Sequence, residues 1–144
     1  MSVSTLLAAT TDRNPKPTII DDSHLERMTL GDRRLEREVL ELFVRQTTIM
    51  LGRIVGPDRG LAAASAHTLK GSARGIGAWR VARAAELVEN AANGESGAIA
   101  GAIPDAIADS MVEAVTELKA ASLEASAAIG SRLTSLLAEL ARDR

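Results

Sequence analysis

Apolar residues recur at intervals of three and four through most of this chain, and no other feature constrains its fold as strongly. This is the spacing of helices that each bury one face. Alternating apolar and polar runs typical of strands are missing. The spacing therefore predicts an all-α fold, in which four long helices bury their apolar faces in an antiparallel four-helix bundle. The expected helices cover roughly residues 32–54, 61–74, 78–92 and 104 onward.

The predicted core consists of the apolar stripes on these helices. The first stripe holds Leu35, Val39, Leu42, Phe43, Ile49 and Met50, the third helix contributes Val81, Ala85 and Val88, and the last helix contributes Ile107, Met111, Ala114, Leu118, Ala121 and Ala125.

Helix start and stop signals divide the N-terminal part of the chain. Residues 1–20 combine polar residues with two closely spaced prolines and predict a disordered tail. A short helix is then expected in DDSHLERMTLG, capped by Asp21, Asp22 or Ser23 and ended by Gly31. Asp32 is placed to cap the first long helix. Residues 21–144 are expected to form a single domain.

The C-terminal region allows two interpretations. Its apolar phase continues through Ile129, Leu133, Leu136 and Leu140, which predicts one long helix. Such a helix would expose a strip that a second copy could cover, made of Leu133, Leu136, Leu137 and Leu140. Gly130 and Ser131 also permit a break, after which the leucines would fold back onto the bundle. The break, and with it a monomer, is slightly preferred over a homodimer.

Composition narrows the classes of function. The chain has no cysteine, so a disulfide framework or a thiolate zinc site is excluded. A net charge of -2 and only two aromatic residues argue against nucleic-acid binding. Neither a signal peptide nor a membrane-spanning segment is recognisable, so a cytoplasmic protein is expected.

A histidine in the second predicted helix stands out. On a helical projection His67 shares one face with Ala63, Ala64, Lys70, Gly71 and Arg74, and the apolar residues Ala62, Leu69, Ala73 and Ile76 lie opposite. His67 and Lys70 are therefore expected to be exposed, with small or basic neighbours and an anion nearby. Glycine within a helix costs about 1 kcal/mol relative to alanine. Gly71 therefore suggests a place where a side chain would obstruct a partner.

A neutral imidazole is nucleophilic near pH 7 and can accept a phosphoryl group. Lys70 would then neutralise phosphoryl oxygens, Gly71 would leave them room, and Arg74 would add a more distant positive charge. By spacing alone, an ordinary surface histidine is an equally good interpretation. His24 has no ligand spacing around it, so no metal site is predicted.

The stretch AHTLKGSARGIGAWRVARAAELVE resembles the signature of the histidine-containing phosphotransfer (HPt) family. The H-x-L-K-G-S core is present from His67 to Ser72, and Gly77 follows ten residues after the histidine. The upstream TLGDRRLEREVLELFVRQ is similar to the helix that precedes this motif in the family. The resemblance covers about residues 22–125.

This resemblance implies a bundle whose histidine carries a phosphoryl group between receiver-domain aspartates in a bacterial-type two-component phosphorelay. It also implies no ATP-dependent kinase activity and no cofactor on this chain, with Mg²⁺ supplied by the receiver. Glu89 stands where some relatives place an amide near the phosphoryl group, and the chain from about Ser126 exceeds the minimal bundle. The alternative is a non-catalytic helical adaptor or dimerisation module.

Three polar or aromatic residues near the motif have two interpretations each. Gln46 would hydrogen-bond near His67 or serve as a satisfied polar residue at the bundle edge, and the second is preferred. Ser72 would assist the phosphoryl site or bond its own helix backbone. Trp79 would contact a partner or cover the short N-terminal helix, and the covering role is preferred.

Overall fold

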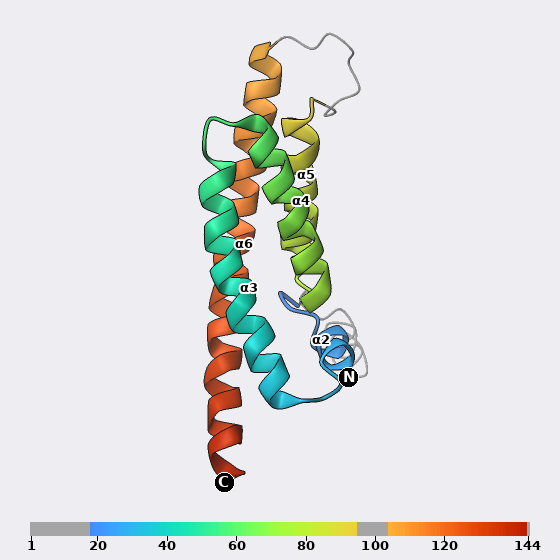
Figure 1. Ribbon diagram of the computed structural model, residues 1–144, viewed down its shortest axis with the longest axis vertical. Coiled ribbons are helices and arrows are strands. Elements are labelled where there is room, and N and C mark those ends of the chain that lie inside the picture. The colour runs from blue at the N-terminus through green and yellow to red at the C-terminus, as the bar shows by residue number, and fades with distance from the viewer. Residues whose placement is uncertain (1–17, 95–103, 144) are drawn as a thin grey trace, which may run out of the picture.

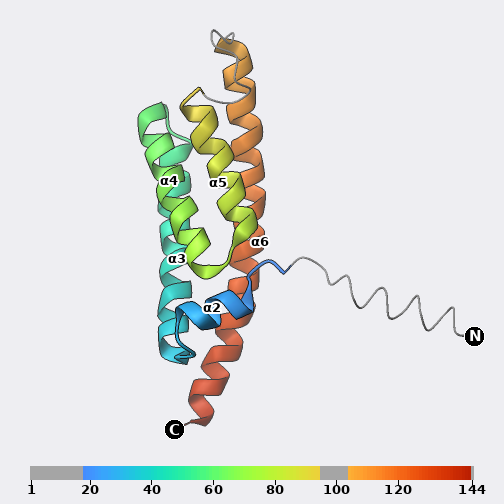
Figure 2. The same ribbon diagram turned by 90° about the vertical axis from the view of Figure 1, so that its right-hand side faces the viewer.

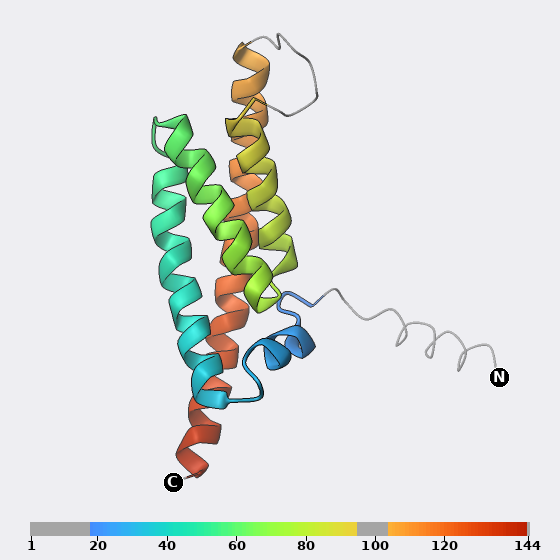
Figure 3. The same ribbon diagram turned by 45° about the vertical axis from the view of Figure 1, so that its right-hand side comes forward.

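The computed structural model describes residues 18–94 and 104–143, where helices are the only regular elements. A short helix, α2 (Asp22–Met28), precedes four longer ones: α3 (Arg33–Ile54), α4 (Arg59–Ile76), α5 (Trp79–Ala92) and α6 (Pro104–Arg142). The long helices alternate in direction, and α3 and α5 each pack against both α4 and α6 (Figures 1 and 3). The predicted all-α bundle with a short N-terminal helix and a C-terminal extension is confirmed.

Aspartates begin three of the helices. The Asp21 side chain accepts a hydrogen bond from the backbone N–H of His24, and Asp32 accepts from two N–H groups in the first turn of α3. Asp58 caps α4 in the same way. These bonds satisfy N–H groups that have no partner within the helix. Asp21 and Asp32 therefore act as predicted.

The predicted core is correct for α5 and the first half of α6 but only in part for α3, where Phe43 and Met50 are buried and Val39 packs against the core. Val81, Ala85 and Val88 are buried, as are Ala114, Leu118, Ala121 and Ala125, and Met111 packs at the core's edge. The side chain of Ile107 lies outside the described residues. In α3, Leu35, Leu42 and Ile49 are exposed, and the buried positions are Glu36, Leu40, Phe43, Thr47, Met50 and Ile54.

The C-terminal region is one continuous helix, so the preferred break at Gly130 is wrong. α6 extends from Pro104 to Arg142 and reaches beyond the other helices at both ends (Figures 1 and 2). Ile129 and Leu136 are buried in the common core, and Leu133 packs against it. The extension thus lengthens the bundle core instead of folding back.

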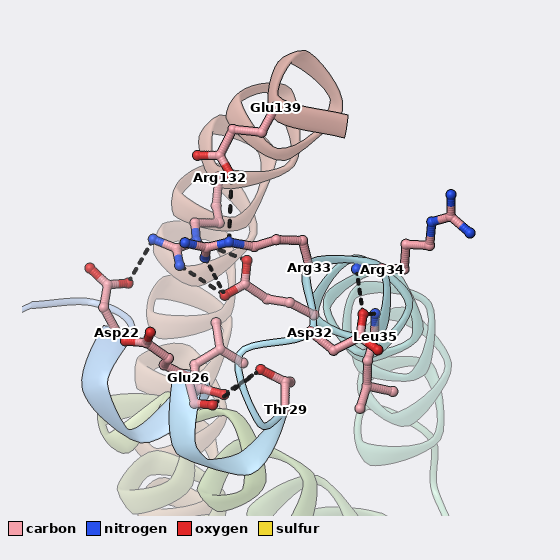
Figure 4. Close-up of polar contacts among 11 residues, drawn as sticks. Asp22, Glu26, Thr29, Asp32, Arg33, Arg34, Leu35, Arg132 and Glu139 are labelled. Atoms are coloured by element: carbon pink, nitrogen blue, oxygen red, sulfur yellow. Dashed lines mark hydrogen bonds and ion pairs between the residues drawn. The ribbon is translucent and has the colours of Figure 1, made fainter. Parts of the chain in front are cut away.

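Charged residues join this extension to the N-terminal helices. Arg132 of α6 donates to both carboxylate oxygens of Glu36, at 2.8 and 3.4 Å, although Glu36 is only 1% exposed. Arg132 also reaches Asp22 of α2, while Arg33 pairs with Glu139 (Figure 4). One arginine therefore connects α2, α3 and α6.

The α2 helix is anchored to the turn between α4 and α5. The indole N–H of Trp79 donates to the Asp21 carboxylate at 3.0 Å, and this bond lowers the pKa of Asp21 below its ordinary value. The His24 ring lies against Trp79, with ring centroids 4.9 Å apart, and its Nε2 bonds the carbonyl oxygen of Arg74 at 2.8 Å. The predicted covering role of Trp79 is confirmed. Ile19 and Ile20 pack beside the core, whereas residues 1–17 of the predicted tail lie outside the described residues.

Gly77 allows this close approach. It ends α4 in the left-handed conformation, with φ of 79°, and a Cβ atom there would lie 2.8 Å from Cβ of Asp21. Gly75 lies within α4, and a Cβ atom added there would meet nothing within 4 Å beyond its own helix backbone. Gly77→Ala is expected to lower the free energy of unfolding by about 2 kcal/mol, because strain and a clash add together.

Gly75→Ala is the matched control for that prediction. It should raise stability by up to about 1 kcal/mol, since alanine is the better helix former. Thermal unfolding of both variants measures the difference, and equal melting temperatures would contradict the role assigned to Gly77.

Candidate functional site

His67 lies on the outer face of α4, where its side chain is 67% exposed. The opposite face of the same helix carries Ala62, Leu69, Ala73 and Ile76, all buried. Packing of these four residues against the bundle fixes the rotation of α4 and turns the imidazole outward. The predicted placement of His67 is confirmed.

A carboxylate from the neighbouring helix binds the imidazole. Nδ1 of His67 lies 2.7 Å from Oε2 of Glu89, which is in the last turns of α5. The other oxygen, Oε1, accepts a hydrogen bond from Nζ of Lys70 at 2.6 Å. Glu89 therefore bridges the two residues of the motif that the sequence singled out.

This bridge changes the surroundings expected for Lys70. Its side chain is only 14% exposed, and that of Glu89 is 17% exposed, so the expectation of an exposed lysine is wrong. The hydrogen bond from Lys70 holds the pKa of Glu89 below its ordinary value; burial opposes this effect, and the bond from His67 adds to it. Glu89 is thus an anion near neutral pH, and this interaction stabilises the fold until acid protonates it.

Small residues leave space around the imidazole. Gly71 lies one turn after His67, and a Cβ atom placed on it would have no heavy atom within 4 Å beyond its own helix backbone. Ala64 is exposed on the preceding turn, but Ala63 is buried, so its predicted place on the exposed face is wrong. Arg74 is exposed and pairs with Glu86 at 3.8 Å. The fold itself therefore does not require glycine at position 71.

A shallow apolar groove lies between α2, α3 and α4. It is lined by Met28, Thr29, Val39, Leu42, Phe43, Gln46, Ser72, Gly75 and Ile76. Within it the Ser72 hydroxyl donates to the Gln46 side chain at 3.3 Å. Gln46 is thus a satisfied polar residue, as preferred, and Ser72 bonds across the groove instead of to its own helix backbone.

Sequence reasoning missed the role of Glu89 as a direct ligand of the imidazole. An anion beside His67 was expected from its basic neighbours, and Glu89 was noted only as a replacement for an amide. The two residues are 22 positions apart on different helices, so helical periodicity cannot pair them. The one available signal was that Glu89 stands where some members of the family place an amide near the phosphoryl group.

Comparison with known proteins places this site in a family. The family model of the Hpt domain matches residues 38–143, and the chain belongs to the histidine-containing phosphotransfer domain family. An X-ray structure of a rice protein assigned to the histidine-containing phosphotransfer proteins has the same fold, with a TM-score of 0.65. It is 15% identical, and the alignment covers 94% of this chain and 91% of the rice chain. No curated protein sequence matches significantly.

Within residues 18–94 and 104–143, none of the helices has the length and apolar character needed to cross a bilayer.

Proposed function

We propose that this chain relays a phosphoryl group between aspartates of two receiver domains, with His67 as the residue that carries it. The observation that supports this proposal most directly is the exposed imidazole of His67. Its Nδ1 contacts Glu89, so that Nε2 is the nitrogen left to react. Membership of the family supports histidine phosphotransfer in general. We further propose that the relay connects two receiver domains, that it takes place in the cytoplasm, and that the chain acts as a monomer.

The chemistry follows from the free nitrogen. The lone pair of Nε2 attacks phosphorus of an aspartyl phosphate, the P–O bond breaks, and its electron pair returns to the aspartate. Nδ1 keeps its proton, and Lys70 lies one turn away to attract the phosphoryl oxygens. The receiver would supply Mg²⁺ and the acceptor carboxylate for the reverse step.

The surface around His67 suits a docking protein. The apolar groove shares α4 with His67, and Met28, Leu30 and Leu42 are exposed on α2, α3 and their connection. We propose that the receiver covers this groove together with the imidazole, so that Ala64, Gly71 and Arg74 contact it. Ser72 and Gln46 would then act through the shape of the groove and not by binding phosphate.

Transfer from a single phosphorylated receiver domain tests the proposal. Radiolabel should reach the wild type and His24→Gln but not His67→Gln, because His24 is engaged by the Arg74 carbonyl and by Trp79. Labelling of His67→Gln would contradict the assignment. Binding of receivers without any labelling of the wild type would favour the helical adaptor.

Side-chain volume at Gly71 gives a second prediction. Gly71→Ala should raise stability by about 1 kcal/mol, whereas Gly71→Gln should fold but slow transfer by at least about tenfold, a barrier of about 1.4 kcal/mol. Gly130→Gln is the control, because Gly130 also has open space around it but lies on α6, which packs against α3 and α5. Transfer by Gly71→Gln at the wild-type rate would refute the steric role.

A further inference from the structure

Glu89 does more than occupy the place of an amide, because its two oxygens contact two different groups. Oε2 lies 2.7 Å from Nδ1 of His67, and Oε1 accepts from Lys70 at 2.6 Å. One oxygen of the carboxylate therefore contacts the reactive ring, and the other contacts the ammonium group of Lys70. An amide at this position could not be an acceptor at both atoms.

The short contact with Glu89 determines which ring nitrogen carries the proton. An ionised carboxylate only accepts hydrogen bonds, so the proton of this bond belongs to Nδ1 of His67. His24 has the opposite arrangement, because its Nε2 faces the carbonyl oxygen of Arg74, which also only accepts. The two histidines of the chain are thus held as opposite tautomers.

Phosphorylation of Nε2 makes the Nδ1 proton chemically important. A ring that carries both the Nδ1 proton and the phosphoryl group is a cation, and an anion beside it favours that form. Loss of the proton would leave the Nδ1 lone pair facing the Glu89 carboxylate, two acceptors without a proton between them. Glu89 therefore opposes deprotonation of the phosphorylated ring.

The proton also determines what leaves when the phosphoryl group departs. As the N–P bond breaks, its electron pair stays on Nε2, and the acceptor oxygen forms the new P–O bond. With the proton on Nδ1, the leaving group is neutral imidazole; without it, the leaving group would be the far more basic imidazolate. We propose, building on the proposed function, that Glu89 is a positioning residue that keeps phosphorylated His67 protonated on Nδ1 and so accelerates loss of the phosphoryl group.

The other charged groups on this face come from α4 and α5, and Lys70 is the one that Glu89 contacts. Lys70 and Arg74 come from α4, and Glu86 and Glu89 come from α5, while α3 contributes the neutral Gln46 to the adjoining groove. Glu89 shares Lys70 with the incoming phosphoryl group. In Glu89→Gln the ring loses its anionic partner, and Lys70 is free to bind the phosphoryl oxygens. Both changes should prolong the life of phosphohistidine.

Chemical phosphorylation isolates this effect from any receiver. The full chain is loaded with phosphoramidate, and the first-order loss of phosphohistidine to water is followed from about pH 5 to about pH 9, a range that spans ordinary histidine titration. Glu89→Gln should lose the group about tenfold more slowly near pH 8, since a charged hydrogen bond exceeds a neutral one by about 1.4 kcal/mol. Its rate should also begin to fall at a lower pH.

Glu86→Gln is the matched control, because Glu86 lies one turn earlier on α5 and pairs with Arg74 instead of His67. It should keep the wild-type lifetime and pH profile. Equal lifetimes and profiles for wild type and Glu89→Gln would overturn the role of Glu89 while leaving His67 as the carrier. Failure of phosphoramidate to label His67 in the wild type would overturn the proposed function as well.

Nitrogen-15 NMR of the unphosphorylated wild type tests the starting tautomer without any variant. It should find the neutral His67 ring protonated on Nδ1 and the neutral His24 ring protonated on Nε2. A His67 ring protonated on Nε2 would contradict the inference, even if Glu89→Gln proved too unstable to measure.

Discussion

Arg132→Ala is expected to lower the free energy of unfolding by about 3 kcal/mol, because it leaves the carboxylate of Glu36 buried without its main partner. Arg33 stays 3.6 Å from Glu36 and compensates only in part. For a chain of this size the melting temperature should fall by roughly 10 °C. Thermal and urea unfolding monitored by circular dichroism measure the change.

Arg80→Ala provides the control for burial. Arg80 also pairs with two carboxylates of α6, Glu117 and Glu124, but all three side chains are exposed, so its loss should barely alter the melting temperature. Replacing both Glu36 and Arg132 by methionine should recover most of the stability lost in Arg132→Ala. Equal effects of Arg132→Ala and Arg80→Ala would contradict the structural role of the buried pair.

Leu136→Ala is expected to cost about 3 kcal/mol, because it creates a cavity in a core that extends along α6. Leu136 is 2% exposed, and its neighbour Leu137 is 49% exposed. Leu137→Ala should therefore cost far less, although the two residues are identical in type and adjacent in sequence. Similar losses for both would show that the extension does not pack as described.

The exposure of the C-terminal leucines also bears on the oligomeric state. Of the apolar strip that a second copy was expected to cover, Leu136 is buried and Leu133 packs against the core, whereas Leu137 is exposed. A monomer stays the proposal, and light scattering of the full chain tests it.

Periodicity predicted the number and order of the helices but not every buried face. In α3 it selected Leu35, Leu42 and Ile49 because it counts only apolar residues. The face that is buried includes Glu36, whose partner Arg132 is 96 residues away, and Thr47, whose hydroxyl donates to the backbone of Phe43. Burial of Glu36 depends on a partner that a local pattern cannot identify, whereas Thr47 is satisfied within its own helix and is overlooked because it is polar.

The slight preference for a break in α6 was wrong for a similar reason. Glycine weakens a helix by about 1 kcal/mol, so Gly130 was a reasonable place for a break. Its neighbours decide otherwise, because Ile129 is fully buried and Arg132 binds Glu36. Tertiary contacts on both sides of Gly130 thus outweigh its local preference.

The candidate site was predictable where its residues share one helix. His67, Lys70 and Gly71 lie within five positions of one another, so helical geometry and the family motif identify them together. Glu89 joins them only through the packing of α5 against α4. The sequence therefore predicted the histidine and its basic neighbours, but it did not predict the hydrogen bonds that hold the imidazole.

A complete relay in the absence of ATP tests the central proposal most directly. One receiver domain of the source organism is phosphorylated with radiolabel, freed of its donor, and mixed with this chain and a second receiver domain. Across a panel of receiver pairs, we predict that label reaches a second receiver through the wild type and through His24→Gln, and that it stays on the first receiver with His67→Gln. Label that reaches the second receiver equally well with His67→Gln would contradict the account.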